Sequence, residues 1–176
     1  MKPFYSSYIN SPLGAMIAVS SENGVCHLGF LDSVRLDDLY QYYGQLSGQP
    51  VLKEANRHLE FLEQELDQYF HGKLKEFESK LDLKGTDFQL EVWTALCTIM
   101  YGGTCSYKYL SNKLELINSY RAVANANGKN PVSILVPCHR VIGSDGTLTG
   151  YSGGLDRKKR LLQLELANTP QLHTLF

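Results

Sequence analysis

The sequence predicts an α/β first domain followed by a mainly α-helical domain that carries a helix-turn-helix. Short apolar segments of strand type, separated by turn signals, open the chain. From Gly85 onwards, helix-start signals and apolar residues at helical spacing take their place. A chain of 176 residues is long enough for two small domains, each with a core of its own. We therefore expect the domains to cover residues 1–84 and 85–176.

The first domain begins with strand-like segments joined by turns. Asn23-Gly24 lies between two of them, and Asn-Gly between apolar runs is a typical hairpin turn. Apolar residues at three- and four-residue spacing then predict one amphipathic helix over residues 52–70, ended by Gly72, with its apolar side towards the core. Residues 73–84 indicate a strand and a linker. The strand-like segments are 4–10, 15–20 and 25–30.

The second domain is a succession of helix signals. Two short helices joined by a tight turn indicate a helix-turn-helix. The helix after Asn118 carries small residues, including Ala122 and Ala124, around a single Arg121. Small residues suit a close, sequence-indifferent approach to a nucleic-acid backbone, and they equally suit tight helix packing. The predicted helices start at Gly85-Thr86-Asp87, cover 107–114 with Ser106 as N-cap, cover 119–127 with Asn118 as N-cap, and cover 156–167.

Charge divides unevenly between the two halves. Residues 1–85 hold 8 Lys and Arg against 12 Asp and Glu, a net charge of −4, whereas residues 86–176 hold 9 against 6, a net charge of +3. This distribution permits a DNA-contacting face in the second half. The run Arg157-Lys158-Lys159-Arg160 is either a phosphate clamp or, more commonly for such a run, a solvated first turn of a helix.

The cysteines and the chain ends indicate a soluble intracellular protein. Four cysteines without a Cys-x-x-Cys pair predict free thiols and no metal site. Cys26-His27 lies in a strand-like segment, where adjacent side chains point to opposite faces, so we interpret both as ordinary strand residues. No apolar run has the length of a membrane span, and residues 1–5 lack the apolar core of a signal peptide.

Pro137-Cys138-His139-Arg140 is the most informative stretch. It follows the apolar run 133–136, which we expect to be a buried β-type segment. A cysteine beside a histidine and an arginine has the ingredients of an activated thiolate. Adjacent residues of an extended chain point to opposite faces, so a water between Cys138 and His139 is easier than direct contact.

Two hydrolase readings compete with alkyl transfer onto this cysteine. Residues 150–154 satisfy the G-x-S-x-G pattern of serine hydrolases, but the only later histidine is His173 in the C-terminal tail, and we reject this reading. A cysteine hydrolase using Cys138 and His139 would need an oxyanion hole, and the sequence shows none.

Alkyl transfer is favoured because the sequence resembles the O6-alkylguanine-DNA alkyltransferases. Residues 130–143 look like their active-site signature, and the resemblance extends from about residue 5 to residue 166. It implies an RNase H-like sheet in the first domain and a suicide repair protein that needs no cofactor. Further matching motifs are Ser11-Pro12-Leu13-Gly14, Gly85-Thr86-x-Phe88-Gln89-x-x-Val92-Trp93, Ser106-Tyr107, Arg121-Ala122-Val123 and Gly150-Tyr151-Ser152-Gly153-Gly154-Leu155.

The resemblance also implies a partner and a role for each site residue. The partner is double-stranded DNA carrying O6-alkylguanine or O4-alkylthymine, whose damaged base is flipped into a pocket. The protein is expected to be a monomer that can assemble cooperatively on DNA, in the cytoplasm, or in the nucleus of a nucleated cell. The implied roles are Cys138 as acceptor, His139 and Glu165 as its proton relay through a water, Tyr107 as proton donor to the leaving base, Arg121 as finger, Tyr107, Lys108 and Ser144 as DNA contacts, Asn130 as hinge, and Tyr151 with Ser152 as alkyl pocket.

The chain departs from the family pattern at several positions. Ala124 replaces a common Gly, Met100 replaces a familiar Pro, and residues 115–118 lack the usual Gly or Pro of the helix-turn-helix turn. None of these positions is the nucleophile. Some relatives lack the cysteine and only sense damage, so a non-enzymatic sensor that binds alkylated DNA and recruits partners is the alternative function. The presence of Cys138 argues against it.

Overall fold

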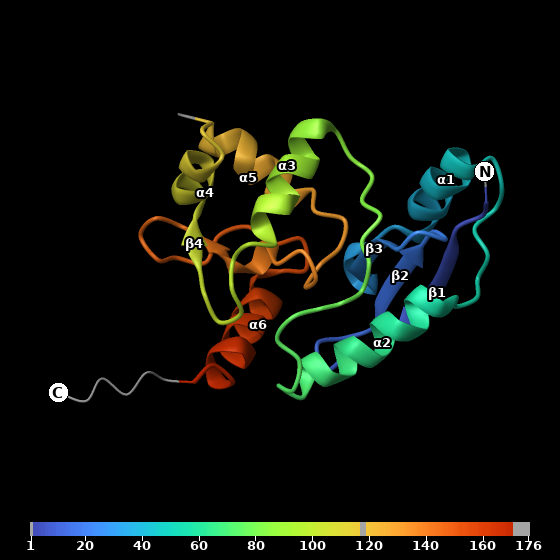
Figure 1. Cartoon of the computed structure of the whole chain (residues 1–176), viewed down its shortest axis with the longest axis horizontal. Coiled ribbons are helices and arrows are strands. Elements are labelled where there is room, and N and C mark those ends of the chain that lie inside the picture. Colours follow the sequence, from blue (N-terminus) through green and yellow to red (C-terminus); the bar gives the residue numbers. More distant parts are fainter. Residues whose placement is uncertain (1, 117–118, 171–176) are drawn as a thin grey trace.

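The computed structural model describes residues 2–116 and 119–170. Figure 1 shows a sheet with two helices in the first half of the chain and a group of helices in the second half. The predicted fold class, α/β followed by mainly α-helical, is confirmed. In chain order the elements are β1 Tyr5–Ile9, β2 Met16–Ser20, β3 Val25–Phe30, the 3-10 helix η1 Leu31–Ser33, α1 Leu36–Ser47, α2 Arg57–Phe70, α3 Asp87–Leu96, β4 Cys105–Ser106, α4 Tyr107–Lys113, α5 Tyr120–Gly128, the 3-10 helix η2 Cys138–Arg140, β5 Val141–Ile142 and α6 Leu155–Ala167.

The first half is an antiparallel sheet with a helix on each face. Its strands follow the order β1-β2-β3, with Ser7 opposite Ala18 and Ala18 opposite Leu28. Alternate residues of β2 belong to different cores, because successive side chains of a strand point to opposite faces. Met16 and Ala18 pack with the apolar side of α2, whereas Ile17 and Val19 pack with α1. The sheet is therefore buried on both faces.

The helices of this half differ from the prediction in two ways. The helix α1 was not predicted, and α2 begins at Arg57 rather than at residue 52. The side chain of Asn56 caps α2 by accepting from the amides of His58 and Leu59. Leu52 instead pairs with the sheet edge, donating its amide to Phe4 O at 2.9 Å. Its backbone groups are satisfied by β1, so they cannot belong to a helix.

The linker is mostly irregular. The strand predicted within residues 73–84 is reduced to one bridge, in which Val25 N donates to Lys80 O and Asp82 N donates to Val25 O, both at 2.8 Å. Thr86 then starts α3 with a capping box, because its side chain accepts from Gln89 N and the Gln89 side chain accepts from Thr86 N. The predicted helix start at Gly85-Thr86-Asp87 is thus confirmed.

The helices α4 and α5 form the predicted helix pair. Ser106 caps α4 by accepting from Tyr109 N at 3.0 Å, as predicted. The cap predicted at Asn118 lies outside the described residues, and α5 begins at Tyr120. Trp93 of α3 donates its indole N–H to Ala126 O at 2.9 Å, which ties α5 to the core. In the turn, Glu115 has a φ of 56°, in the left-handed region that Gly adopts more readily than Glu.

The two halves are joined through the edge of the sheet. Leu28 of β3 donates its amide to Pro131 O and accepts from Ser133 N, at 2.9 and 2.8 Å. Arg157 of α6 adds two hydrogen bonds to Asp32, each of 2.8 Å. The segment that leads to Cys138 is therefore attached to the first half. No helix within residues 2–116 and 119–170 is both long and apolar enough to cross a membrane.

Candidate active site

The segment before the cysteine is a turn held by Asn130. The Asn130 amide donates to Val136 O at 2.8 Å and to Val132 O at 3.3 Å, and its oxygen accepts from Val132 N at 3.0 Å. Ile134 has a φ of 75°, which is incompatible with a strand. The prediction of a β-type segment over 133–136 is therefore wrong. Buried apolar runs of this length do not reveal their conformation through periodicity.

Cys138 begins the 3-10 helix η2 and is 3% exposed. Burial raises the pKa of its thiol, because a thiolate is poorly solvated there, while the Asn130 side chain and the Lys158 ammonium act in the opposite direction. The thiol is thus kept protonated at rest, with a cation nearby that favours its ionised form.

The next two residues both contact one buried carboxylate. His139 Nε2 lies 2.8 Å from Glu165 Oε1, and Arg140 forms a two-pronged pair with Glu165 through Nε at 2.9 Å and Nη2 at 3.0 Å. Burial opposes ionisation of Glu165, but the hydrogen bonds from His139 and Arg140 outweigh it and lower its pKa to about 2. The predicted hydrogen bond between His139 and Glu165 is confirmed.

The histidine is neutral and has one nitrogen free. Burial lowers the pKa of His139, and the attraction of Glu165 compensates only in part. With Nε2–H directed at the carboxylate, Nδ1 is the nitrogen with the lone pair. It is buried and has no hydrogen-bond partner among the described residues. His139 can therefore accept a proton at Nδ1.

Two more groups, neither predicted from the sequence, contact Glu165. Tyr69 of α2 donates its hydroxyl to Oε1 at 2.7 Å, and Gly102 donates its amide to Oε2 at 3.1 Å. Tyr69 stands 96 positions away in the sequence and belongs to the apolar stripe of α2. Its spacing marks it as a core residue, and no local pattern indicates its polar contact.

The basic run of α6 is neither a phosphate clamp nor a solvated turn at its first two positions. Lys158 is fully buried and donates to Val141 O, Thr149 O and Gly150 O at 2.5, 2.6 and 3.2 Å. Burial lowers its pKa to about 8. Arg157 pairs with Asp32, and its guanidinium lies 4.2 Å from the ring centre of Phe30. Both predicted readings are wrong for these residues.

The loop after η2 carries Tyr151 and Ser152 and contacts Tyr107. Tyr107, the first residue of α4, donates its hydroxyl to Thr149 O at 3.4 Å, and burial raises its pKa. The ring of Tyr151 meets that of His139 edge-on, with centres 6.5 Å apart. Ser152 and Ser144 are exposed on the same loop. The structure thus brings Tyr107 and Tyr151 to the thiol and leaves both serines at the surface.

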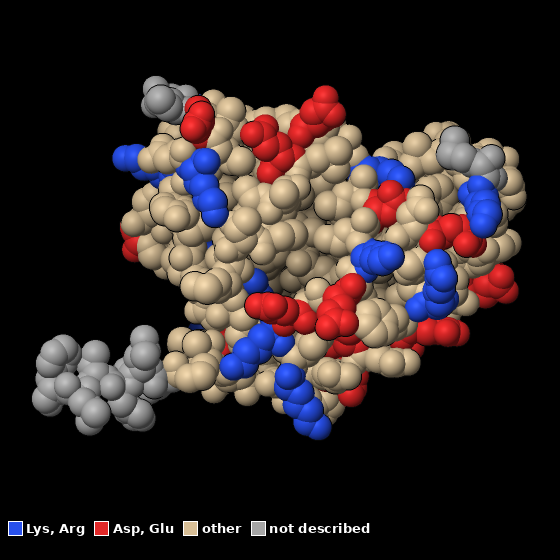
Figure 2. Space-filling model, viewed as in Figure 1, with Lys and Arg blue, Asp and Glu red and all other residues tan. Residues whose placement is uncertain are grey.

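Two predicted DNA contacts of the helix pair, Arg121 and Lys108, are exposed, whereas Tyr107 is partly buried. Arg121 lies at the start of α5, with its guanidinium 5.9 Å from the ring centre of Tyr120, and Lys108 lies in the first turn of α4. The helix α2, in contrast, presents acidic side chains to solvent, visible as a row at the lower right of Figure 2. These carboxylates repel a phosphate backbone, whereas the Lys and Arg side chains of the helix pair attract it.

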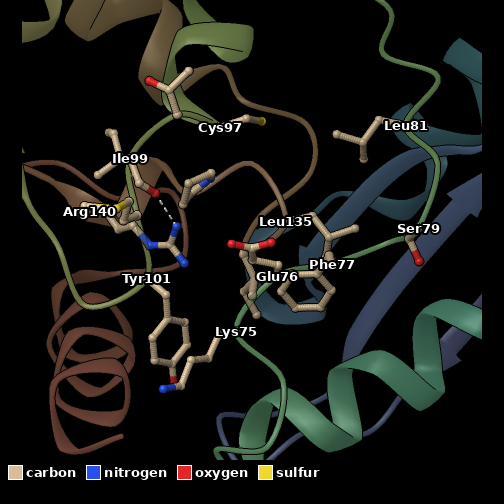
Figure 3. A pocket seen from close by; sticks show the side chains of 14 residues that line it. Lys75, Glu76, Phe77, Ser79, Leu81, Cys97, Ile99, Tyr101, Leu135 and Arg140 are labelled. Atoms are coloured by element: carbon tan, nitrogen blue, oxygen red, sulfur yellow. Dashed lines mark hydrogen bonds between the residues drawn. The ribbon is translucent and has the colours of Figure 1, made fainter. Parts of the chain in front are cut away.

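A cavity of about 540 Å³ lies behind the active-site turn. Figure 3 shows Arg140 pointing into it, with Nη1 donating to Ile99 O at 2.6 Å, and Phe77 of the linker on another side. Cys138 does not line this cavity. Within the described part of the chain, no group of three or more His, Cys, Asp or Glu could hold a metal ion.

The fold and this site define a class: a two-part protein with a helix pair suited to DNA and a buried cysteine beside a His–Glu pair. Residues 87–167 match the family model of the 6-O-methylguanine DNA methyltransferase DNA binding domain, and residues 4–83 match that of its ribonuclease-like domain. The chain belongs to the 6-O-methylguanine DNA methyltransferase family.

Individual relatives span nearly the whole chain. The methylated-DNA–protein-cysteine methyltransferase of Methanosarcina barkeri is 44% identical over 164 residues, which cover 93% of this chain and 98% of the relative. A crystal structure of the Mycobacterium tuberculosis O6-methylguanine methyltransferase is 38% identical, covers 96% of both chains and has a TM-score of 0.80. The Mycobacterium tuberculosis protein OGT in complex with DNA has a TM-score of 0.82 at 38% identity, covering 95% of this chain and 96% of its own.

Proposed function

We propose that this protein repairs double-stranded DNA by moving the alkyl group of O6-alkylguanine, and of O4-alkylthymine, onto Cys138. A bond forms between Sγ and the alkyl carbon, and the bond between that carbon and the base oxygen breaks. Because the thioether is stable, each molecule acts once. The transfer needs no cofactor, because the alkyl carbon moves directly from the base oxygen to Sγ. The observation that carries the proposal is the buried Nδ1 of His139, which has no hydrogen-bond partner among the described residues and belongs to the residue next to Cys138.

The relay would generate the thiolate only when it is needed. The Cys138 proton passes to His139 Nδ1 through a water, and Glu165 stabilises the imidazolium that forms. The buried Lys158 ammonium favours the thiolate during this step. A thiolate is a strong nucleophile, which suits attack on saturated carbon.

The leaving base needs a proton on its ring, and we assign this step to Tyr107. Burial raises the pKa of its hydroxyl, so the group stays protonated and can donate at neutral pH. Tyr151 and Ser152 would line the alkyl pocket, on the loop that carries Gly150 with a φ of 46°. Asn130 would act as the hinge, because its side chain fixes the turn that presents Cys138.

The helix pair and the loop after η2 would hold the DNA. Arg121 would fill the gap left by the flipped base, while Tyr107, Lys108 and Ser144 would contact the backbone. We further propose that the protein is a monomer that can assemble cooperatively on DNA, with its domain boundary at residues 84 and 85. We also propose that it acts in the cytoplasm of a cell without a nucleus, or in the nucleus of a nucleated cell.

The test is the intact mass of the protein after mixing with a short duplex that contains one O6-methylguanine. We expect a gain of one methylene, localised to Cys138, and no further turnover. Cys138→Ala should gain nothing, whereas Cys26→Ala, which removes another buried cysteine, should react like the wild type. An unchanged wild-type mass with retained binding would establish the damage sensor instead.

A further inference from the structure

The carboxylate of the relay is completed by a residue of the first domain. Glu165 Oε1 accepts from three donors: His139 Nε2 at 2.8 Å, Tyr69 OH at 2.7 Å and Arg140 Nη2 at 3.0 Å. Of these, Tyr69 alone comes from the N-terminal half, from the end of α2 that approaches α6 in Figure 1. Its hydrogen bond is the shortest of the three.

Tyr69 is held in this position from several sides. Its ring centre lies 5.3 Å from that of Phe77 and 6.0 Å from that of Tyr101, and both of these rings also line the cavity of Figure 3. One turn earlier on α2, the buried Glu65 accepts from the amides of Glu78 and Ser79 at 2.6 and 3.0 Å. This contact fixes the linker segment that carries Phe77. The hydroxyl of Tyr69 is therefore aimed by packing on both sides.

We propose that Tyr69 is a positioning residue of the alkyl transfer, through which the N-terminal domain orients Glu165 and so aligns His139 with Cys138. The inference rests on the proposed function of the site. It makes the ribonuclease-like domain a part of the reactive centre rather than only a support for it.

The physical reason is that bulk solvent does not reach Glu165 to replace a lost partner. Its side chain is fully buried, as is that of His139. When Tyr69 no longer donates to Oε1, the carboxylate settles towards Arg140 and Gly102, and the imidazole of His139, which stays hydrogen bonded to it, follows. A small misplacement of a proton relay costs rate without preventing binding, because the DNA contacts lie elsewhere.

Tyr69→Phe tests this with the loss of a single oxygen atom. The matched control is Tyr43→Phe, because Tyr43 is also buried in the first domain and donates its hydroxyl to Cys26 O at 3.0 Å, away from the site. Single-turnover rates are measured against duplex concentration, with the reacting fraction counted by intact mass. Both variants are assayed at one temperature below the lower of their melting points.

We expect Tyr69→Phe to lower the maximal rate about tenfold and to leave the duplex concentration for half-maximal rate unchanged. Tyr43→Phe should stay within about twofold of the wild type, since it loses a comparable buried hydrogen bond without touching the relay. Equal rates for the two variants, or a loss confined to the half-maximal concentration, would overturn the role of Tyr69. A wild-type protein that takes up no methyl group would overturn the proposed function itself.

Discussion

The chain contains the dipeptide Cys-His twice, in surroundings that give it opposite properties. Cys26 and His27 lie on strand β3, and Cys138 and His139 lie on the 3-10 helix η2. Both cysteines are buried, and each histidine has one ring nitrogen without a partner among the described residues. The dipeptide sequence and the burial of the thiols therefore do not distinguish the pairs.

The charged neighbours distinguish them. Burial, together with the carboxylate of Asp82, raises the pKa of Cys26 to about 11, and burial alone lowers the pKa of His27 to about 4. Cys138 has the Lys158 ammonium nearby, and His139 has the carboxylate of Glu165. An anion near the first thiol opposes ionisation, whereas a cation near the second favours it. A buried thiol thus becomes a nucleophile through its neighbours.

The largest difference between the two pairs is expected in stability, when the carboxylate beside each pair is neutralised. Glu165→Gln leaves the buried Arg140 without its counter-ion and should lower the free energy of unfolding by about 3–5 kcal/mol. Asp82→Asn should cost about 1 kcal/mol or less, because its partner Lys84 has a side chain that is 34% exposed. Urea unfolding at pH 7 measures both. Equal losses would show that the two carboxylates contribute equally to the free energy of unfolding, which would contradict this difference between the pairs.

Replacing each histidine tests the chemistry. His139→Gln removes the proton acceptor and should slow methyl transfer about 10²-fold or more, equivalent to about 2.7 kcal/mol. His27→Gln should leave the rate within about twofold, because its ring has no contact with the site. The measurement is the single-turnover rate with the methylated duplex. A comparable slowing in His27→Gln would mean that the first pair also serves the reaction.

The smallest effect is a pH dependence of stability that originates in the first pair. Because burial lowers the pKa of His27 from 6.5 to about 4, the unfolded chain binds more protons between these values. The free energy of unfolding therefore falls as the pH falls through this window, with His27 contributing about 2–3 kcal/mol of the loss at pH 4. His27→Gln should lose less stability than the wild type between pH 7 and pH 4. Parallel urea unfolding curves for the two proteins would exclude this contribution.

Local hydrogen bonds made part of the fold predictable. The Thr86 and Ser106 caps and the hairpin at Asn23-Gly24 depend on neighbouring residues only, and the structure has them where the sequence predicts them. The helix α1 could have been predicted in the same way as α2, because Leu36, Leu39, Tyr43 and Leu46 recur at three- and four-residue spacing. The turn at Ile134 escaped prediction because its conformation is imposed by Asn130 and by pairing with Leu28.

The site was predictable at the residues that match motifs of the family, and not at the residues outside those motifs. The bond between His139 and Glu165 followed from matched positions. Lys158 was hidden in a basic run, because charge alone does not show which of four neighbouring residues turns inwards. Tyr69 was hidden in an apolar stripe, because its partner lies in the other half of the chain. Both contacts depend on how the halves meet.

The indole of Trp93, which is hydrogen bonded to α5, is an intrinsic fluorescent probe of this part of the fold. It is the only tryptophan in the sequence, and it is 2% exposed in the described fold. Its emission therefore has a single origin, at the contact between α3 and the helix that carries Arg121. Light emitted from this one ring reports whether α5 shifts when DNA docks, without a dye and without any change to the sequence.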